Sequence, residues 1–310
     1  MSAPDAGEHP WKVFARIPSL AGRSYAVTDL PGGLTNRNYR LTSDDAQDPL
    51  DVVVRISDPT TGLLAVDRQA EYENSVRAAG VGVGAPVVDY LPGQGVLVVG
   101  YLPSRTFDDA DVAGNLTRVA ASVRRLHTAE PFVNRFDFFA IHRHYLRIMD
   151  EHGFRMPAGY LDLLPTAARV EAALSVRPEP LVSCHNDLLS ANFLDEGARI
   201  RIIDYEYSGL NEPSFELGNI AQEAHLSPAQ LAALVAAYHG GESAQTDRSL
   251  ARARLWSVMS AYGWTLWGTI QAGASRIDYD FWGWAMDKLD RAAGAMTSPG
   301  FETLLDEVAG

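Results

Sequence analysis

The sequence predicts an α+β protein in which a strand-rich N-terminal part precedes a mainly helical C-terminal part. Two observations support this prediction. Short β-branched runs separated by glycine- and proline-containing turns dominate the first hundred residues. Beyond them, the apolar residues recur mostly at helical spacing. A chain of 310 residues suits two lobes, and we expect them to comprise residues 1–102 and 103–310.

The first two strands are expected to enclose a ligand-binding turn. Its sequence, PGGLTNRN, contains Gly32 and Gly33, which let the backbone approach a ligand closely. The polar side chains of Thr35, Asn36 and Asn38 can offer hydrogen bonds to phosphate oxygens. An ordinary β-hairpin turn is the alternative. The strands of this lobe are expected at 24–29, 38–42, 51–56, 87–90 and 95–101.

A cation and a carboxylate are expected to face each other in the N-terminal lobe. Arg55 lies near the end of the strand DVVVRI, and a helix expected from about 65 to 79 carries Glu71 and Glu73. A strand cation paired with a helix carboxylate is an arrangement that anchors nucleotide phosphates. We favour Glu71 as the partner. Solvent-facing positions for all three side chains are the alternative.

The connection between the lobes is expected to bind a nucleobase. Gly100, Tyr101 and Leu102 lie where the strand pattern changes to a turn, and backbone groups of such a segment commonly contact adenine. The C-terminal lobe is expected to contain helices at 112–126 and 252–274 and a further helix from about residue 280. The stretch 132–160 gives no clear pattern.

The segment VSCHNDLLSANFLDEGARIRIIDYEYSG is the most informative part of the chain. His185, Asp187 and Asn192 lie in one turn-rich stretch, and Asp204 follows an apolar run. This spacing is typical of a phosphotransfer centre, in which one carboxylate acts as base and an amide and a second carboxylate hold Mg²⁺ on the phosphates of ATP. We therefore predict Asp187 as the base and Asn192 and Asp204 as the metal ligands.

Other interpretations of this segment remain. His185 either orients the loop or is a buried, satisfied histidine. Asp and Asn are also common in solvated turns. A hydrolase that uses His185 and Asp187 as metal ligands is a further option, although no second histidine pair has suitable spacing. Cys184 is expected to be a buried structural residue, because neighbours on an extended chain point to opposite faces.

Tryptophan is concentrated near the C-terminus. Trp264 and Trp267 share one helix face, and Trp284 follows on the next helix. Such a stripe is usually part of a core. The alternative is an aromatic box for an ammonium group, to which Glu223 could add a charge.

Composition excludes several classes of protein. Asp and Glu outnumber Lys and Arg by 39 to 26, so nucleic acid is not an expected partner. No apolar run reaches the roughly 20 residues of a membrane span, and the N-terminus has no signal-peptide pattern. The one cysteine cannot form an internal disulfide, which fits a cytoplasmic location.

These motifs resemble those of the choline/ethanolamine kinases, within the wider aminoglycoside-phosphotransferase-like group. The resemblance runs from about Gly32 to Ala292 and rests on GGLTNRNYR, YLPSR, HNDLLSAN, IDYEYSGLNEPSFELGN and WTLWGTIQ. It implies a two-lobed, protein-kinase-like fold and an arginine in place of the usual strand lysine. It also implies a trimethylammonium cage that draws on Trp264, Trp267 and Trp284, with Glu223 nearby. The departures are Leu189 for Gln, Glu216 for Asp and Trp284 for Tyr.

The predicted function is a Mg²⁺-dependent kinase that transfers the γ-phosphate of ATP to a small cationic amino alcohol, choline first. Ethanolamine, thiamine and an aminoglycoside are the rival acceptors. A non-catalytic nucleotide-binding protein is the rival from another class, and it predicts loss of the base or of the metal ligands. The sequence leaves the oligomeric state open.

Overall fold

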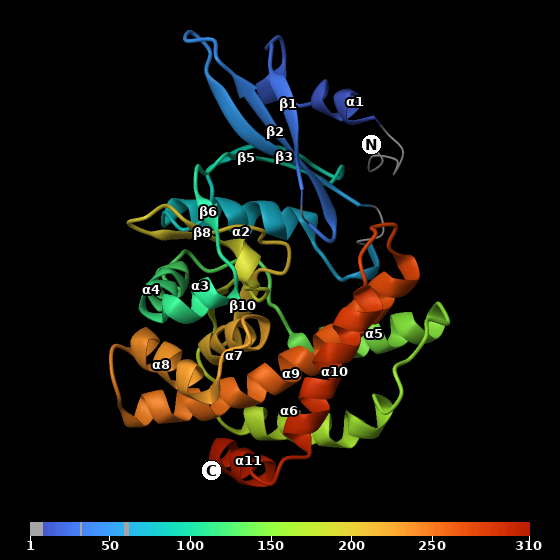
Figure 1. The fold of residues 1–310 in the computed structure, drawn as a ribbon, viewed down its shortest axis with the longest axis vertical. Helices are drawn as coiled ribbons and strands as arrows, with labels where there is room; N and C mark the ends of the chain where they lie inside the picture. Colours follow the sequence, from blue (N-terminus) through green and yellow to red (C-terminus); the bar gives the residue numbers. More distant parts are fainter. Residues whose placement is uncertain (1–8, 32, 59–61) are drawn as a thin grey trace.

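The computed structural model describes residues 9–31, 33–58 and 62–310. An antiparallel sheet forms one end of the molecule and a helical body the other, with helix α2 (Arg68–Gly80) between them (Figure 1). This architecture confirms the α+β class and the order of the two parts along the chain. The boundary at residue 102 stays a prediction. In the described part of the chain, no helix has both the length and the apolar character of a membrane span.

The N-terminal sheet places one side of its central strand toward the helical body. Strand β3 alternates: Val52, Val54 and Ile56 are buried in the core of this lobe, whereas Val53 and Arg55 line a cavity on the opposite side. Because side chains alternate between the two faces of a strand, Arg55 points toward the cavity. The strands run in the order β1 (Ala26–Leu30), β2 (Asn36–Ser43), β3 (Leu50–Ser57), β5 (Val96–Gly100) and β4 (Val87–Leu91).

Helix α2 connects the sheet to the helical body. Asp67 caps it by accepting hydrogen bonds from the backbone N–H groups of Gln69 and Ala70. On its buried face, Asn74 donates through Nδ2 to Asn134 Oδ1, at 2.9 Å, and to Ser208 Oγ, at 3.0 Å. These bonds attach the helix to the C-terminal lobe and fix Glu71, one turn earlier, beside the cavity.

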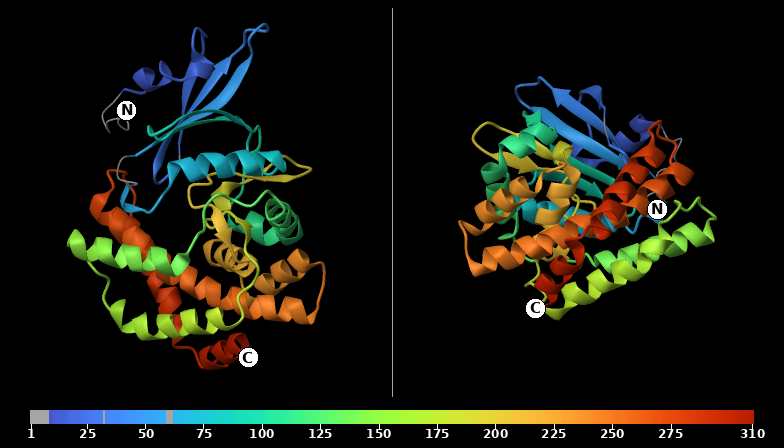
Figure 2. Two further views of the ribbon diagram at one scale, coloured as in Figure 1. Left: turned by 180° about the vertical axis from the view of Figure 1, so that it is seen from behind. Right: turned by 60° about the horizontal axis from the view of Figure 1, so that its bottom comes forward.

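Long helix α9 is the centre of the C-terminal lobe, and α7 and α10 pack along it (Figures 1 and 2). Short strands carry the polar segment 182–209 above this helical layer. Helix α1 (Pro10–Phe14) belongs to the N-terminal part and packs on the sheet. The helices of the C-terminal lobe are α3 (Asp109–Gly114), α4 (Leu116–Leu126), α5 (Phe138–Glu151), α6 (Leu164–Val176), α7 (Pro213–Glu223), α8 (Pro228–His239), α9 (Ala244–Ala274), α10 (Phe281–Met296) and α11 (Phe301–Ala309). The strands are β6 (Arg105–Thr106), β7 (Val182–Cys184), β8 (Phe193–Asp195), β9 (Ile200–Ile202) and β10 (Gly209–Asn211).

Several predicted boundaries were wrong. The helix expected at 112–126 is interrupted at Asn115, whose φ of −127° and ψ of 28° are not helical, so α3 and α4 are separate. Helix α9 begins eight residues before the predicted start at Arg252, because Ser243 caps it by accepting from the N–H of Thr246. The unassigned stretch 132–160 contains α5, which Asp137 caps.

The close approach of α7 and α9 requires glycine at position 218. A Cβ on Gly218 would lie 2.4 Å from the carbonyl oxygen of Ala253. We expect Gly218→Ala to lower the free energy of unfolding by about 1–3 kcal/mol, because neither helix backbone can move freely. Urea unfolding measures this change.

The matched control is Gly294→Ala in the exposed part of α10, where a Cβ would meet nothing within 4 Å. That variant should gain about 0.5–1 kcal/mol, because alanine is the better helix former. A loss of stability at both positions would contradict the packing argument.

Candidate active site

Hydrogen bonds to side chains of α7 hold the loop that follows β7. The two oxygens of Glu216 accept the backbone N–H groups of His185, at 2.9 Å, and Asn186, at 2.7 Å. Asn219 Oδ1 accepts the N–H of Leu188 at 2.7 Å. Asn186 has a φ of 69°, a conformation that asparagine tolerates better than most residues. The loop therefore has a fixed shape before any ligand binds.

Asp187, Asn192 and Asp204 converge at one end of this loop. Asn192 donates through Nδ2 to the carbonyl oxygen of Asp187 at 2.8 Å, and its own carbonyl accepts the N–H of Ile203 at 3.1 Å. Asp204 follows directly, with a φ of 70°. Asn192 and Asp204 both line a cavity of about 400 Å³ between the sheet and the C-terminal lobe.

Most of the predicted nucleotide-binding residues line the same cavity. They are Gly33, Asn38, Arg55, Gly100, Tyr101 and Leu102. Its apolar lining includes Val53, Ala85, Leu97, Val99, Leu194 and Ile203, a surface suited to a flat base. The predicted Gly32 lies outside the described residues. Thr35 and Asn36 are buried, but they do not belong to the cavity lining.

Arg55 forms ion pairs with Glu71 and with Asp204. The residue is only 9% exposed, so its charge needs these two carboxylates. Glu73, the other candidate partner, is instead bonded to the side chain of Gln69 at 3.0 Å. Arg55 thus connects β3, α2 and the metal-ligand candidate after β9.

Glu206 is a site residue that the sequence reasoning missed. Its carboxylate accepts Thr35 Oγ1, at 3.0 Å, Asn36 Nδ2, at 3.2 Å, and Arg68 Nη1, at 3.1 Å. Arg68 also reaches Glu71 at 2.8 Å. Thr35 and Asn36 therefore attach the turn to the C-terminal lobe. The signal available was position: Glu206 lies two residues after Asp204.

Burial and acidic neighbours determine the pKa of Asp187. Its pKa is raised well above the ordinary value, first because burial disfavours the carboxylate and then because Glu223, Glu206 and Asp204 are close. Lys288 acts in the opposite direction. A carboxylate with a raised pKa is a better proton acceptor than an ordinary aspartate.

His185 is buried and orients the loop. Its Nε2 hydrogen-bonds the carbonyl oxygen of Ile203 at 2.8 Å, and its Nδ1 accepts the N–H of Asp187 at 3.3 Å. Burial lowers the pKa of the imidazole, so the ring is neutral. Both ring nitrogens are engaged, which opposes the interpretation of His185 as a metal ligand. Cys184 is fully buried, and burial raises the pKa of its thiol well above the usual range.

The three predicted cage tryptophans form one aromatic cluster with Tyr207. Trp264 contacts the ring of Tyr207 edge-on at 5.0 Å, and Trp267 Nε1 donates to the Tyr207 hydroxyl at 2.9 Å. Trp267 lies 5.3 Å from Trp284. Trp264 and Trp267 are buried, whereas Trp284 is half-buried. The cluster is therefore part of the core, with its more accessible face at Trp284.

An internal ammonium group already occupies this cluster. Lys288 Nζ lies 4.2 Å from the ring centroid of Trp284 and 2.9 Å from both carboxylate oxygens of Glu223. Lys288 is 1% exposed and Glu223 is 8% exposed. Sequence reasoning placed Glu223 near the cage but missed its lysine partner, which lies 65 residues away in the chain.

Comparisons with known proteins identify the family of the chain. Residues 27–230 match the family model described as choline/ethanolamine kinase. Protein LicA of Haemophilus influenzae is 32% identical over 63% of this chain and 58% of its own length. Ethanolamine kinase 2 of Rattus norvegicus is 27% identical over 84% of this chain and 73% of its own length.

Solved structures share the fold. A choline/ethanolamine kinase family protein from Mesorhizobium loti has a TM-score of 0.81 and 33% identity, covering 96% of this chain and 97% of that one. The choline kinase LicA from Streptococcus pneumoniae has a TM-score of 0.76 at 22% identity, covering 92% and 98%. An aminoglycoside 2'-phosphotransferase-IIIa bound to GDP has a TM-score of 0.60 at 12% identity, covering 91% and 97%.

The chain therefore belongs to the choline/ethanolamine kinase family, whose members are ATP-dependent phosphotransferases acting on an alcohol. The expected family, its structural relation to the aminoglycoside phosphotransferases and the kinase-like fold are confirmed.

The bonds at Glu206 give a test of how the lobes are held together. We expect Glu206→Gln to lower the free energy of unfolding by about 2 kcal/mol, because hydrogen bonds to a buried carboxylate are lost or weakened. Thermal and urea unfolding measure this loss. Glu73→Gln, at a half-buried position on α2 where the carboxylate accepts one bond from Gln69, removes the same charge and should change stability by less than about 0.5 kcal/mol. Equal effects at both positions would contradict the role given to Glu206.

Proposed function

We propose that the chain transfers the γ-phosphate of ATP to the hydroxyl group of a small amino alcohol, choline first. The observation that carries this proposal is that Asn192 and Asp204 both line the cavity between the lobes, while Asp187, whose carbonyl oxygen is bonded to Asn192, lies close to Asp204. The aromatic cluster of Trp264, Trp267 and Trp284 supports a cationic acceptor.

Asp187 has the properties of the catalytic base. The loop below it is fixed by Glu216 and Asn219, so the carboxylate needs little reorganisation to act. Its role is to orient the acceptor hydroxyl and to accept its proton as the bond to phosphorus forms. The raised pKa, caused mainly by burial, favours that acceptance.

The residues present suit a magnesium ion. Asn192 uses its Nδ2 in the bond to Asp187, which leaves Oδ1 as a hard oxygen ligand. Asp204 contributes a carboxylate that is 31% exposed at the side chain. Mg²⁺ would supply charge neutralisation on the phosphates when bound. The two arginines Arg55 and Arg68 face three carboxylates, Glu71, Asp204 and Glu206, so the cluster has a negative charge to spare for a cation.

The nucleotide would bind between the lobes. The backbone of Gly100, Tyr101 and Leu102 borders an apolar part of the cavity, where a purine ring fits, and Arg55 and Asn38 lie toward the phosphate end near Asp204. Arg55 can fork to phosphate oxygens as a permanently charged side chain. Thr35 and Asn36 are bonded to Glu206 and hold the turn in place.

The environment of Glu223 favours choline over ethanolamine. Both of its oxygens are bonded to Lys288, so a primary ammonium would find no free carboxylate there. A trimethylammonium group donates no hydrogen bonds and needs only aromatic faces. The relatives support both acceptors, since one is an ethanolamine kinase and a structural neighbour is a choline kinase. Ethanolamine is therefore the main alternative.

Thiamine stays an alternative acceptor, and an aminoglycoside is a weaker one. An aminoglycoside carries several primary ammonium groups and calls for several carboxylates. At the tryptophan cluster the described residues offer Glu223, which is already paired with Lys288. A non-catalytic nucleotide-binding protein would be expected to have lost the base or a metal ligand, whereas Asp187, Asn192 and Asp204 are all present.

Asp187→Ala tests the proposed reaction. We expect this variant to bind ATP with nearly unchanged affinity and to lose about 10²–10⁴-fold in turnover, because only the base is removed. Magnesium-dependent release of ADP is measured with choline, ethanolamine, thiamine and an aminoglycoside, and ATP affinity by calorimetry. Comparable phosphorylation by the variant would remove Asp187 from its assigned role, and no acceptor-dependent ADP release from the unaltered protein would refute the proposed function.

Lys288→Met tests the basis of acceptor choice. The substitution frees the carboxylate of Glu223, to which a primary ammonium can donate hydrogen bonds and a trimethylammonium cannot. We expect the ratio of kcat/KM for ethanolamine to that for choline to rise by about tenfold, equivalent to 1.4 kcal/mol. Steady-state kinetics with both acceptors measure this ratio.

Loss of Lys288 alone leaves a buried charge, so a second variant is needed. Lys288→Met combined with Glu223→Gln removes both charges and avoids most of the penalty of an unpaired buried carboxylate. This double variant should fold and lack the gain for ethanolamine. An unchanged acceptor ratio in a folded Lys288→Met protein would contradict the argument.

A further inference from the structure

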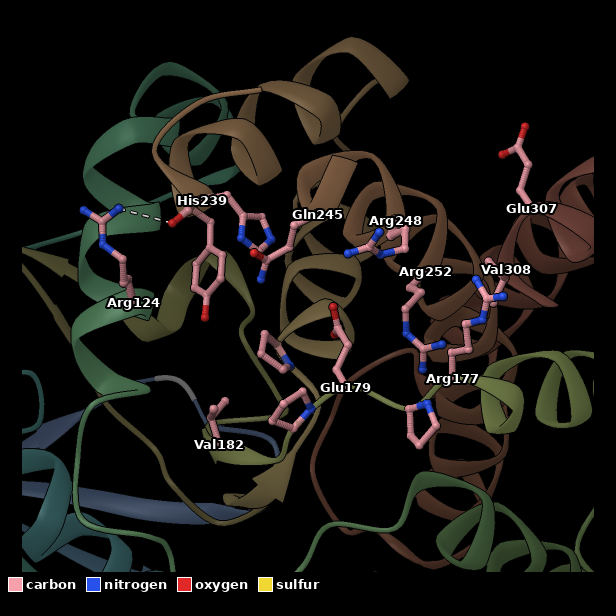
Figure 3. A pocket seen from close by; sticks show the side chains of 14 residues that line it. Arg124, Arg177, Glu179, Val182, His239, Gln245, Arg248, Arg252, Glu307 and Val308 are labelled. Atoms are coloured by element: carbon pink, nitrogen blue, oxygen red, sulfur yellow. Dashed lines mark hydrogen bonds between the residues drawn. The ribbon is translucent and has the colours of Figure 1, made fainter. Parts of the chain in front are cut away.

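A second large cavity lies in the C-terminal lobe, away from the cleft between the lobes. Its volume is about 620 Å³, and none of its lining residues belongs to the cavity that contains Arg55 and Asp204. It is bounded by the loop that follows α6, the end of α8, the starts of α7 and α9, and α11 (Figure 3). A volume of this size suits a small metabolite.

Arginine is concentrated in this cavity, although the chain carries a net charge of −13. Arg124, Arg177, Arg248 and Arg252 all line it (Figure 3). Arg124 donates to the carbonyl oxygen of Tyr238 at 3.1 Å. Arg177 and Arg248 are exposed, and their side chains have no hydrogen bond or ion pair to the residues that the structure describes. Their donors are therefore available to a ligand.

Arg252 adds unused donors at the buried side of the cavity. It is 4% exposed, and it pairs through Nη2 with Glu212. Its Nε and Nη1 are buried and have no partner among the described residues. A buried donor without a partner is costly unless something accepts from it. This pair of unpartnered donors adds positive potential at the buried side of the cavity, independently of the exposed arginines.

The start of α9 faces the same cavity. Gln245, Arg248 and Arg252 lie at positions i, i+3 and i+7, which share one helix face. The positive end of a helix dipole favours an anion within its first turn. At the start of neighbouring α7, the N–H of Ser214 already donates to the carboxylate of Glu179 at 3.0 Å. At the start of α9, Ser243 already accepts the N–H of Thr246, so the side chains of Arg177 and Arg248 are the donors left for another anion.

We propose that this cavity binds a small organic phosphate, with Arg177 and Arg248 contacting the phosphate group. A planar guanidinium offers paired donors that match phosphate oxygens. The carboxylates of Glu179 and Glu307 also line the cavity, and they disfavour a polyanion such as a nucleic acid. The ligand class is therefore a phosphate monoester of metabolite size.

The test measures binding in the presence of a non-hydrolysable ATP analogue and Mg²⁺, which fill the cleft between the lobes. The probes are glycerol 3-phosphate and inorganic phosphate, and calorimetry measures the binding of each. We expect saturable binding to the unaltered protein, at least tenfold weaker binding to Arg248→Ala, and loss of binding in the double variant Arg177→Ala/Arg248→Ala. Binding of both probes, or of either one with this dependence on the arginines, supports the proposal, and the comparison distinguishes an ester from the free ion.

The matched control is Arg254→Ala. Arg254 lies on the same helix and is exposed, but it does not line the cavity. Its substitution by alanine removes the same charge as Arg248→Ala. This variant should bind the probes like the unaltered protein. Equal weakening in Arg248→Ala and Arg254→Ala, unchanged binding in the double variant, or no saturable binding at all would overturn the proposal. Because the readout is binding at a separate cavity, its failure leaves the proposed kinase reaction untouched.

Discussion

The placement of Arg55 between Glu71 and Asp204 is the constraint on which the rest of the site depends. A guanidinium that is almost fully buried must be compensated, and the two carboxylates come from different parts of the chain. Strand β3, helix α2 and the segment after β9 are therefore held in one arrangement. Arg68 extends the same alternation of charges to Glu206, which reaches the turn between β1 and β2. Electrostatics thus specify the relative positions of the elements around the cavity.

Sequence reasoning succeeded where one local pattern carries the information. The strand DVVVRI is visible because it is a dense run of β-branched residues, and the alternation of side chains along a strand places Arg55 on the cavity side. Asp187 and Asn192 lie close together in the chain, so a short loop brings them into contact. Asp204 could be added because it directly follows an apolar run that is typical of a buried strand. Helix ends were predicted less well, since a single cap such as Ser243 or an interruption such as Asn115 decides them.

The residues that were missed depend on contacts between distant parts of the chain. Glu206 bonds to Thr35 across 171 positions, and Lys288 bonds to Glu223 across 65 positions. No periodicity or spacing rule connects such partners. In the turn PGGLTNRN, a local pattern suggested a ligand contact where the structure shows a contact with a distant part of the chain. The polar side chains of this turn looked like phosphate donors, yet Thr35 and Asn36 satisfy a carboxylate of the other lobe.

The acceptor end raises the question of how a core can also be a binding site. Trp264 and Trp267 are buried, and Trp267 is fixed by its bond to Tyr207. Rigid rings lose little entropy when a ligand packs on them, so burial of their far sides is an advantage for recognition. Burial lowers the pKa of Lys288, and the contacts of its ammonium group with Glu223 and with the face of Trp284 offset part of that cost. A ligand cation at the cluster would then depend on aromatic faces, since the carboxylate of Glu223 is already neutralised from within.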